Sequence, residues 1–594
     1  MALRFLIGAA GTGKTEYCMK EIITAQSTHK GRQIFLVPEQ YTSQAERDLT
    51  ARTERKGILT AEVLSFGRLA HQFFAKNGLN RAVILGDVGK QMALQKILLE
   101  QRDDLPYFCH MMDKNGFVSR LGKTITEFFR YRVTPEQLET LSTQEGLSHS
   151  VQDKCRDMAS IYRRYEEFLS QTYLTGDTTL SLLEEKLASS AAFGDTEIWL
   201  DGFYGFTPQE YGVIAQLLRL CKRVSITLPM DEHSYFASSL PPAAPFFEPH
   251  LTKQKLVSLA EEMGIAMESP VFFKENHRAQ TPALTFLEKN YFYGYYKKSP
   301  DHEGIHICSC ATRESEMAYA AGQILSLVRE KGLRYRDIAI VTNAMSAYEK
   351  GLKGILSEAG IPCFVDSRRD IFSHPLILLV NSLLECVVYD FRYEAIFSYL
   401  KTGLTPMAQE DMDILENYVL AYGIKGYKWK KDVWAYGFQP GQEAEQAYLN
   451  DLRAQVMTPF APLLALKRKK NLPLRDWVTA LVVQLDTLGI AQKLTALSEA
   501  AAAKGNAAKA EEHRQIWQIL MDVLQKAVEI LGDAPMSLDT FARILSAGLE
   551  ESSMGLIPPT ADSLLVGDIE RSRLPDIKAL LVLGVNDGIL PAPA

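Results

Sequence analysis

Leu3-Arg4-Phe5-Leu6-Ile7-Gly8-Ala9-Ala10-Gly11-Thr12-Gly13-Lys14-Thr15 is the stretch that decides the fold of this chain. Its first five residues predict a buried strand, and residues 8–15 fit G-x-x-x-x-G-K-[ST], the pattern of a phosphate-binding loop. In such a loop, backbone N–H groups surround phosphate oxygens, the lysine reaches the outer phosphates, and the hydroxyl group coordinates magnesium. The alternative is a glycine-rich turn with a chance lysine. We expect a nucleoside triphosphate, ATP, to be bound by Gly8, Gly11, Gly13, Lys14 and Thr15.

The composition is ordinary for a soluble globular protein, with 46% apolar and 23% charged residues. No apolar run approaches the ~18 residues of a membrane span, so we expect no membrane partner. The start shows no secretory pattern, and we expect a cytoplasmic location. The eight cysteines lack zinc or iron–sulfur spacing, which predicts buried, reduced thiols. A net charge of −7 argues against coating nucleic acid through overall charge, so any such binding requires a local surface.

Strand-like runs rich in branched apolar residues alternate with helical stretches, which predicts parallel sheets with right-handed crossovers. The first set comprises Leu3–Ile7, Gln33–Val37, Ala61–Ser65, Glu197–Leu200 and Val224–Leu228. The second set comprises Ile305–Ser309, Asp337–Thr342, Cys363–Asp366, Ser563–Val566 and Ala579–Leu583. Two sets predict an α/β fold with two parallel-sheet units.

Two long stretches with helical spacing of apolar residues interrupt these sets. The predicted first unit therefore comprises residues 1–85 and 191–299, with a helical insertion at 86–190. The predicted second unit comprises residues 300–380 and an incomplete part at 555–594, with a helical insertion at 381–554. Within the second insertion, the alanine-rich stretch Ala500–Lys509 contains Gly505 and predicts a helix pair joined by a loose turn.

Asp201 ends the fourth predicted strand, in the sequence Trp199-Leu200-Asp201-Gly202. With a phosphate-binding loop upstream, we expect Thr15 and Asp201 to hold Mg²⁺ or its water shell. The alternative is an aspartate that caps a turn before glycine. Gly202 has no side chain to orient water, and Glu210 lies too far along the chain to be assumed a substitute.

The layout of a phosphate-loop unit followed by a second α/β unit, each with a helical insertion, resembles the RecA-like units of superfamily I helicases. Four more specific strings follow in order: Asp201–Glu210, Glu416–Ile424, Val566–Arg573 and Gly584–Pro591. Together they look like the B subunit of the AddAB (RexAB) helicase–nucleases, and the resemblance runs from the first residue to the last.

This resemblance implies a heterodimer with the A subunit, which processes double-stranded DNA ends for recombinational repair. B subunits of the family are about twice as long as this chain, and their later half carries a nuclease domain with a four-cysteine iron–sulfur cluster. The chain thus resembles the N-terminal, helicase-like portion. We expect the nuclease and the cluster only in the part that has no counterpart here.

Several residues that drive hydrolysis in active superfamily I helicases are replaced. Such helicases have glutamate at the position of Gly202, and an arginine in a Ser-Arg pair where this chain has Ser346-Ala347. Their threonine- and lysine-containing signature before the last strand is replaced by residues 567–573. Loss of a base or of a phosphate-binding arginine costs orders of magnitude in rate. The resemblance therefore implies a retained nucleotide pocket with a weak or absent ATPase, the A subunit supplying the principal translocation.

The resemblance also places single-stranded DNA on the loops after the second and third strands. Gln40 and Thr42 offer neutral donors and acceptors there, and Phe66 and Arg68 offer an aromatic ring and a cation. The alternatives are helix-start packing for Phe66 and a surface ion pair for Arg68. In the family this half is thought to scan the exiting strand for a Chi sequence. His71 stands where the family often has a large aromatic residue, so the Chi sequence read here can differ.

The segment Lys425–Trp434 interleaves cations with aromatic residues. We interpret it as an ordinary loop whose lysines extend over buried tryptophans. The alternative is a surface that grips a duplex arm or the partner protein.

Three functional hypotheses follow from the sequence. The first is a helicase-like B subunit that binds nucleotide and single-stranded DNA within a machine for DNA-end resection. The second is an autonomous ATP-dependent DNA helicase, against which Gly202 and Ala347 weigh. The third is a structural partner with a vestigial phosphate-binding loop.

Overall fold

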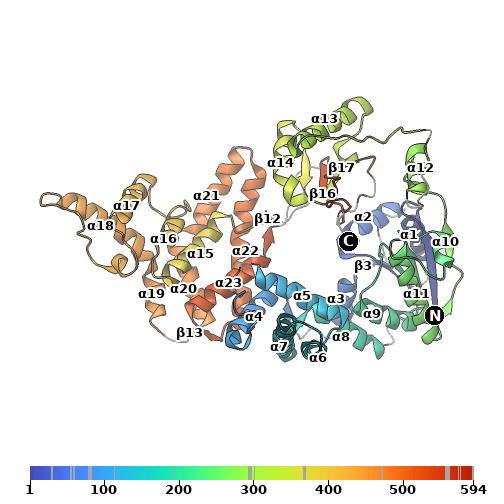
Figure 1. The fold of residues 1–594 in the computed structure, drawn as a ribbon, viewed down its shortest axis with the longest axis horizontal. Coiled ribbons are helices and arrows are strands. Elements are labelled where there is room, and N and C mark those ends of the chain that lie inside the picture. Colours follow the sequence, from blue (N-terminus) through green and yellow to red (C-terminus); the bar gives the residue numbers. More distant parts are fainter. Residues whose placement is uncertain are drawn as a thin grey trace. The chain divides into compact units, whose positions relative to one another are not determined.

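The computed structural model describes residues 1–27, 31–53, 57, 60–77, 83–112, 114, 116–190, 193–291, 297–299, 301–365, 369–469, 472–554, 562–570, 572, 574 and 577–591. The chain divides into two compact units (Figure 1). Unit 1 comprises Met1–Leu85, Thr124–Thr143 and Glu167–Cys308, and unit 2 comprises Gly86–Lys123, Gln144–Glu166 and Ser309–Ala594. Two of the boundaries fall within helices, α5 (Phe117–Tyr131) and α7 (His149–Thr172).

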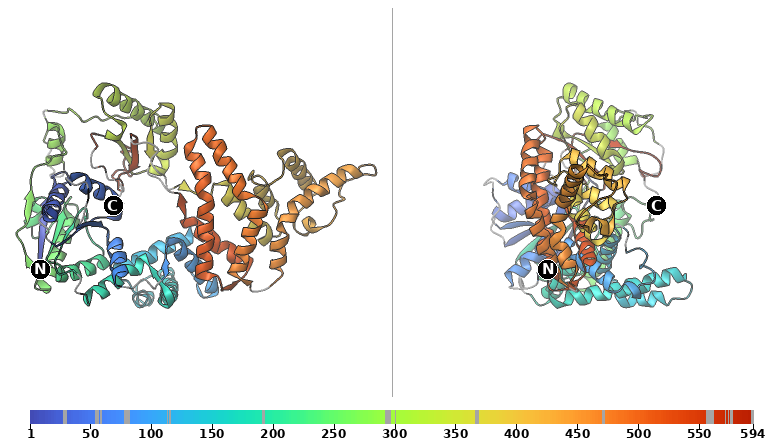
Figure 2. Two further views of the ribbon diagram at one scale, coloured as in Figure 1. Left: turned by 180° about the vertical axis from the view of Figure 1, so that it is seen from behind. Right: turned by 90° about the vertical axis from the view of Figure 1, so that its left-hand side faces the viewer.

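Unit 1 is built on a parallel sheet with the strand order β3-β2-β6-β7-β1-β8, and β9 also pairs with β1. Figure 2 shows two further views of the ribbon, in which the N-terminal strand of this sheet is blue. Its strands are β1 (Ala2–Gly8), β2 (Arg32–Leu36), β3 (Ala61–Leu64), β6 (Thr196–Leu200), β7 (Arg223–Leu228), β8 (Ala266–Met267) and β9 (Val271–Phe273). All five strands predicted for this unit are confirmed. The register from Leu3 opposite Val224 to Ile7 opposite Leu228 brings the carboxyl ends of the strands to one edge, where open parallel sheets place their ligands.

Helices cover both faces of this sheet, because successive side chains of a strand point to opposite sides. Leu3, Phe5 and Ile7 pack on one face, against α3 (Phe66–Lys76), α8 (Gly176–Ala188), α9 (Pro208–Leu220) and α11 (Phe247–Glu262). Leu6 and Phe35 pack on the other face, against α1 (Lys14–Ser27) and α2 (Thr42–Arg52). The unit also contains α6 (Pro135–Ser142), α10 (Glu232–Phe236), α12 (Pro282–Asn290) and the parallel pair β4 (Val83–Leu85) and β5 (Tyr173–Thr175).

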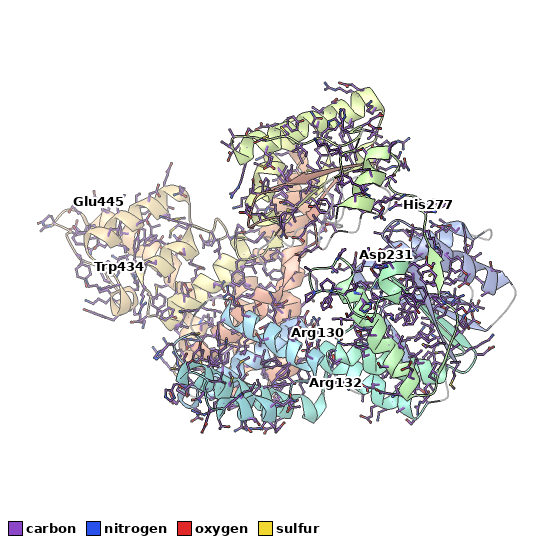
Figure 3. All side chains as sticks on the ribbon, turned by 45° about the vertical axis from the view of Figure 1, so that its right-hand side comes forward. Arg130, Arg132, Asp231, His277, Trp434 and Glu445 are labelled. Atoms are coloured by element: carbon purple, nitrogen blue, oxygen red, sulfur yellow. The ribbon has the colours of Figure 1, made fainter. Side chains whose placement is uncertain are left out.

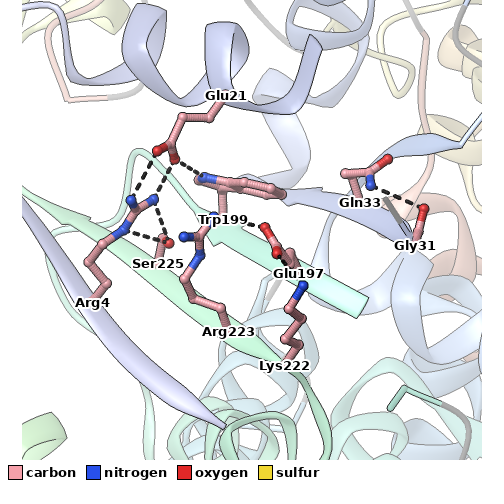
Figure 4. Close-up of polar contacts among 9 residues, drawn as sticks. All are labelled: Arg4, Glu21, Gly31, Gln33, Glu197, Trp199, Lys222, Arg223 and Ser225. Atoms are coloured by element: carbon pink, nitrogen blue, oxygen red, sulfur yellow. Dashed lines mark hydrogen bonds and ion pairs between the residues drawn. The ribbon is translucent and has the colours of Figure 1, made fainter. Parts of the chain in front are cut away.

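A polar network fixes α1 to the sheet (Figure 4). Arg4 of β1 donates to both carboxylate oxygens of Glu21 on α1 and to the hydroxyl group of Ser225 on β7. The indole N–H of Trp199 on β6 also donates to Glu21, over 2.9 Å. Burial by itself raises the pKa of Glu21, but the hydrogen bonds from Arg4 and Trp199 outweigh it, and the pKa is lowered. The network therefore holds α1 in a fixed position relative to three strands.

Glu21→Ala tests this network. The Arg4 side chain is 8% exposed, and removal of its carboxylate leaves a buried guanidinium unpaired, which costs on the order of 3 kcal/mol. We expect hydrogen–deuterium exchange of the amides in β1 and α1 to accelerate by a corresponding factor. Glu16→Ala, which removes exposed ion pairs with Lys20 and Arg52, is the matched control and changes exchange little. Equal effects of the two substitutions would contradict the structural role of Glu21.

Unit 2 contains a second parallel sheet, with the strand order β11-β16-β10-β17. The strands are β11 (Cys363–Val365), β16 (Leu564–Asp568), β10 (Ile338–Thr342) and β17 (Ala579–Leu583). The helices α13 (Arg313–Lys331) and α14 (Met345–Glu358) pack on it. The fold is thus α/β with two RecA-like parallel sheets, as predicted.

The strand predicted at Ile305–Ser309 is wrong, since these residues form no strand. The segment alternates apolar and polar side chains, but a strand also needs a neighbour for its backbone N–H and C=O groups. Residues 305–309 pair with no strand among the described residues. Ile307 is 95% exposed and thus contributes nothing to the core.

The rest of unit 2 is helical. Its helices are α4 (Asp87–Glu100), α15 (Pro375–Val388), α16 (Tyr393–Leu400), α17 (Gln409–Ala421), α18 (Glu443–Met457), α19 (Ala461–Lys467), α20 (Leu474–Thr487), α21 (Ile490–Ala503), α22 (Ala507–Leu531) and α23 (Leu538–Glu551). Two short antiparallel pairs accompany them: β12 (Arg369–Asp370) with β15 (Ser553–Met554), and β13 (Leu472–Pro473) with β14 (Pro535–Met536). The predicted helix pair is confirmed, since α21 and α22 are joined by a turn in which Gly505 has φ +75°. No helix within the described ranges combines the length and the apolar character needed to cross a membrane.

All eight cysteines are free thiols. Cys18, Cys221 and Cys386 are buried as predicted, but Cys308 is exposed, because the segment in which we expected a strand is not packed into a core. Within the described part of the chain, no group of three or more histidine, cysteine, aspartate or glutamate side chains could hold a metal ion.

Candidate nucleotide site and nucleic-acid loops

The predicted phosphate-binding loop joins the end of β1 to the start of α1. Gly11 and Gly13 have φ values of +82° and +85°, a conformation that favours glycine. At Gly8 an added Cβ would clash with Oγ1 of Thr12 and would lie 2.9 Å from Cβ of Phe273. All three glycines are therefore required by the backbone, and they allow the tight curve that a phosphate-binding loop needs.

Lys14 lies folded onto this loop. Its Nζ donates to the carbonyl oxygens of Gly8, over 2.6 Å, and Ala9, over 2.8 Å. Burial lowers the pKa of Lys14 to about 8; the positive charge of Arg278 contributes to the lowering, and the negative charge of Asp201 opposes it. A buried ammonium group held by two neutral carbonyls is well placed to exchange them for phosphate oxygens, which bear negative charge.

Thr15 and Asp201 lie together, as a shared magnesium site requires. The Thr15 hydroxyl donates to Oδ2 of Asp201 over 2.7 Å, and the Thr227 hydroxyl donates to Oδ1 over 2.7 Å. Asp201 is 3% exposed and is placed by the end of β6, where its N–H donates to the carbonyl of Leu36. One carboxylate and one hydroxyl group fit Mg²⁺, which takes few protein ligands and keeps several waters. The metal would replace the hydrogen bond between Thr15 and Asp201.

The residue after Asp201 has a backbone that suits glycine. Gly202 has φ +83°, and its N–H donates to the Thr227 hydroxyl over 3.4 Å. Glu210, the next carboxylate along the chain, does not replace a missing base: its Oε2 accepts from the N–H of Thr207 over 2.8 Å in a capping box at the start of α9. Asp201, a candidate metal ligand, thus lies beside the loop, and the next residue, Gly202, has no side chain that could act as a base.

Three residues that sequence analysis missed lie against the loop. The Asn276 side chain donates to the carbonyl of Ala10 over 3.1 Å, and the N–H of His277 donates to the carbonyl of Gly11 over 2.9 Å. An added Cβ at Gly11 would lie 2.8 Å from Cβ of Arg278, so this exposed arginine begins directly over the loop. His277 is labelled in Figure 3. In the sequence, the polar string Asn276-His277-Arg278 shortly after the strand-like run of β9 could have indicated these residues.

In active superfamily I helicases the phosphate-contacting arginine lies in the second unit, and this chain has Ser346 and Ala347 there. Ser346 and Ala347 lie in the first turn of α14, and the preceding Asn343 side chain donates to the carbonyl of Ile589 over 3.0 Å. Arg571 and Arg573, in the string that replaces the threonine- and lysine-containing signature, lie outside the described residues. In unit 1, Arg278 supplies a cation beside the loop that the sequence did not lead us to expect.

The loops after β2 and β3 are adjacent. Arg68 donates from Nε to Oε1 of Glu39 over 3.2 Å, and the hydroxyl group of Ser65 donates to the other oxygen of Glu39. Gln40 is exposed in the short 3₁₀ helix η1 (Glu39–Tyr41), and the Arg68 side chain is 45% exposed. Gln40 is open to a ligand, whereas Arg68 is accessible but forms with Glu39 the surface ion pair that was the alternative for this residue.

Thr42 and Phe66 are buried at the same two loops. The Thr42 hydroxyl donates to the carbonyl of Glu39 over 2.9 Å, and Phe66 packs edge-on against Phe203 and Phe206. Thr42 is 1% exposed and Phe66 is 5% exposed. A DNA contact by any of the four predicted residues stays a prediction, and it is best supported for Gln40 and Arg68.

Comparison with known proteins agrees with this geometry. Residues 5–288 match a family model described as AddB, N-terminal. The whole chain aligns with proteins named as the B subunit of an ATP-dependent helicase/deoxyribonuclease from Acetivibrio thermocellus (39% identical), Lachnoclostridium phytofermentans (36%) and Desulforamulus reducens (36%). The chain belongs to the AddB family. It spans 52–53% of the length of these three relatives, and thus about half of each. The AddB family match ends at residue 288 and includes both the phosphate-binding loop and Arg278.

Gly202→Ala tests the backbone constraint in this AddB-family site. A Cβ at φ +83° is strained, and we expect a loss of about 1–2 kcal/mol in local stability. The measurement is hydrogen–deuterium exchange of the amides in β6 and β7. Gly194→Ala is the control, because Gly194 lacks a positive φ and a Cβ there would meet nothing within 4 Å. If neither substitution changes hydrogen–deuterium exchange in β6 and β7, the positive φ of Gly202 does not constrain this position.

Proposed function

We propose that this chain is the helicase-like part of the B subunit of a helicase–nuclease that processes double-stranded DNA ends for recombinational repair. In this role it binds ATP with Mg²⁺ and single-stranded DNA, and it pairs with an A subunit in the cytoplasm. The observation that carries the proposal is the cluster of Lys14, Thr15 and Asp201 around a loop of glycines. The names of the relatives support a DNA-processing role for the full-length protein.

In the proposed site, different residues bind the phosphates and the metal. The backbone amides of Gly11 and Gly13 and the ammonium group of Lys14 hold the phosphates, and Arg278 adds a second cation. Thr15 and Asp201 hold the metal, which neutralises charge on the outer phosphates. The position of Gly202 supplies no base to orient water. Binding is therefore favoured over rapid hydrolysis.

One observation, the presence of Arg278 beside the loop, favours the alternative of an autonomous DNA helicase. Arg278 provides part of the cationic stabilisation that hydrolysis requires, whereas Gly202 leaves the water without a base. A vestigial loop in a purely structural partner is a weaker explanation, because the loop keeps its three glycines and Lys14, and the side-chain oxygens of Thr15 and Asp201, the proposed metal ligands, lie 2.7 Å apart. The iron–sulfur cluster of the family is proposed only for the later half of the full-length protein.

The DNA-binding part of the proposal rests on Gln40 and Arg68. Both lie at the carboxyl edge of the unit 1 sheet, with an amide group and a cation exposed. An amide can read base edges, and a guanidinium can pair with phosphate or with guanine. This combination supports the further proposal that the strand is scanned for a Chi sequence.

Calorimetric titration with magnesium and a nonhydrolysable ATP analogue tests the nucleotide site. We expect saturable binding to the full chain that Lys14→Ala abolishes, because the substitution removes the charge that meets the outer phosphates. Lys20→Ala is the matched control, since its side chain lies on the same helix and is 71% exposed. No binding at all would favour the structural partner, and binding that survives Lys14→Ala would contradict the assignment of the nucleotide to this loop.

The lowered pKa of Lys14 predicts a pH dependence of this affinity. With a pKa of about 8 in the empty site, the ammonium group is mostly charged at pH 7 and about 10% charged at pH 9. Affinity for the analogue should fall roughly tenfold between about pH 7 and pH 9, since only the charged form binds phosphate. Lys14→Arg should remove the pH dependence, because arginine keeps its charge throughout this range. An unchanged slope in Lys14→Arg would assign the titration to another group.

A further inference from the structure

The segment Lys425–Trp434 contains a buried aromatic pair. Trp429 and Trp434 are both 0% exposed, and their rings pack edge to face with centroids 5.0 Å apart. Trp434, labelled in Figure 3, donates from its indole N–H to the carbonyl of Lys428 over 2.7 Å. The predicted burial of the two tryptophans is thus confirmed, whereas the lysines of the segment lie over other rings: Lys430 over Phe391 and Lys431 over Tyr427. The burial of the tryptophans does not explain Lys425, Tyr427 and Lys428.

These other residues line a cavity in unit 2. It has a volume of about 390 Å³ and lies between the turn after α15 and the loop after α17. Its lining residues are Tyr389, Asp390, Arg392, Gly423, Lys425, Gly426, Tyr427 and Lys428. Cations, tyrosines and glycine backbone thus face one open space.

The turn that forms one wall is held in a strained conformation. Asp390 and Phe391 both have φ +55°, which costs on the order of 1–2 kcal/mol for each residue other than glycine. Three contacts maintain it: Phe391 is 0% exposed, its N–H donates to the carbonyl of Cys386 over 2.7 Å, and Lys430 pairs with Asp390. Strain that the surroundings maintain in this way is common at ligand clamps.

The opposite wall approaches this turn through glycine. The N–H of Gly426 donates to the carbonyl of Phe391 over 3.4 Å, and an added Cβ at Gly426 would lie 3.2 Å from Oδ2 of Asp390. Gly426 also has φ +60°. The two walls are therefore linked by a backbone hydrogen bond, which holds the two sides of the cavity together.

Two cations at the cavity lack an anionic partner among the described residues. Arg392 and Lys425 are exposed and make no ion pair or side-chain hydrogen bond with any residue that the structure describes. The guanidinium group of Arg392 lies 4.8 Å from the ring centroid of Tyr389, which fixes its position by stacking. A third cation, Lys428, donates to the carbonyls of Tyr422 and Gly423, which occupy two of the three N–H groups of an ammonium.

The rings at the cavity face solvent. Tyr427 is 66% exposed and Tyr389 is 44% exposed, although large aromatic side chains are usually covered. Exposed rings beside cations are the combination that binds the bases and phosphates of a nucleic-acid strand.

We propose that this cavity, the Tyr389–Tyr427 cradle, binds one unpaired nucleotide of single-stranded DNA. Arg392 and Lys425 contact the flanking phosphates, and Tyr427 stacks on the base. The volume is at the small end of the range for ligand sites and suits one nucleotide rather than a duplex groove. A duplex hides the faces of its bases, so the exposed tyrosines favour an unpaired strand.

The proposal adds a second contact for DNA beyond the loops of unit 1, and it rests on the proposed function only in that the strand is DNA. A protein partner is the competing occupant, because exposed tyrosines also occur at protein interfaces. Two exposed cations beside a backbone-lined cavity, in a chain of net charge −7, fit phosphate better.

Fluorescence anisotropy of a labelled oligothymidine, measured on the full chain from about 50 to 300 mM salt, tests the cradle. Each phosphate contact on single-stranded DNA contributes about 0.7 to the slope of log affinity against log salt. Arg392→Ala combined with Lys425→Ala should therefore flatten the slope by about 1.4. Tyr427→Ala should lower affinity roughly tenfold with an unchanged slope, and Tyr427→Phe should restore it.

The control removes the same charge elsewhere in unit 2. Arg329→Ala combined with Lys331→Ala takes two exposed cations from the end of α13 and should leave the slope unchanged. A flattened slope in the control equal to that of the cradle variant would overturn the proposal. A blunt duplex or free thymidine monophosphate that competes as well as the oligomer would also overturn it.

Failure of the cradle proposal can be distinguished from failure of the proposed DNA-binding function. If Arg68→Ala weakens strand binding while the cradle variants do not, the cradle is wrong and the DNA-binding role stands. If the cradle variants keep full strand affinity but no longer associate with the A subunit, the cavity is a protein contact and the proposal is overturned. A chain that binds no strand under any condition contradicts both.

Discussion

The hydrogen bond between Thr15 and Asp201 is the interaction on which the site depends, since it joins the first turn of α1 to the end of β6. Its geometry requires that α1 and the sheet keep a fixed relation. Arg4, Glu21 and Trp199 provide that relation further along the helix. The glycines of the loop then close the distance between β1 and α1. The positions of the Thr15 hydroxyl group and the Asp201 carboxylate thus depend on the strand register, on the packing of α1 against the sheet and on the curvature of the loop.

We propose that the same site binds a triphosphate but hydrolyses it slowly. Lys14, Thr15 and Asp201 lie at the glycine loop, where they are proposed to hold the triphosphate and its metal, and Arg278 begins beside the loop. Against them stands Gly202, whose positive φ suits glycine and leaves no carboxylate to activate water. We propose that such a site holds the nucleotide without rapid turnover. This proposal is consistent with the proposed role of a DNA-binding subunit whose partner supplies the translocation.

Much of the first unit could be predicted from sequence, because buried parallel strands are continuous apolar runs and the phosphate-binding loop is a contiguous motif. Asp201 could be predicted for the same reason, as it directly follows such a run. Arg278 could not, because its relation to the loop arises from the pairing of β9 with β1, two strands that are far apart in the sequence. The prediction of a strand at Ile305–Ser309 was wrong, because the alternation of apolar and polar side chains does not reveal whether a neighbouring strand is available for pairing. Burial of Phe66 likewise depends on neighbours that are distant in sequence, such as Phe203.

The rate of ATP turnover by the purified chain tests the central claim most directly, with and without single-stranded DNA and with Lys14→Ala as the baseline. A nucleotide site without a base predicts turnover that DNA does not stimulate and that barely exceeds this baseline. Rapid turnover that rises with DNA and disappears in Lys14→Ala would contradict the account, because it would show that a complete hydrolytic apparatus is present.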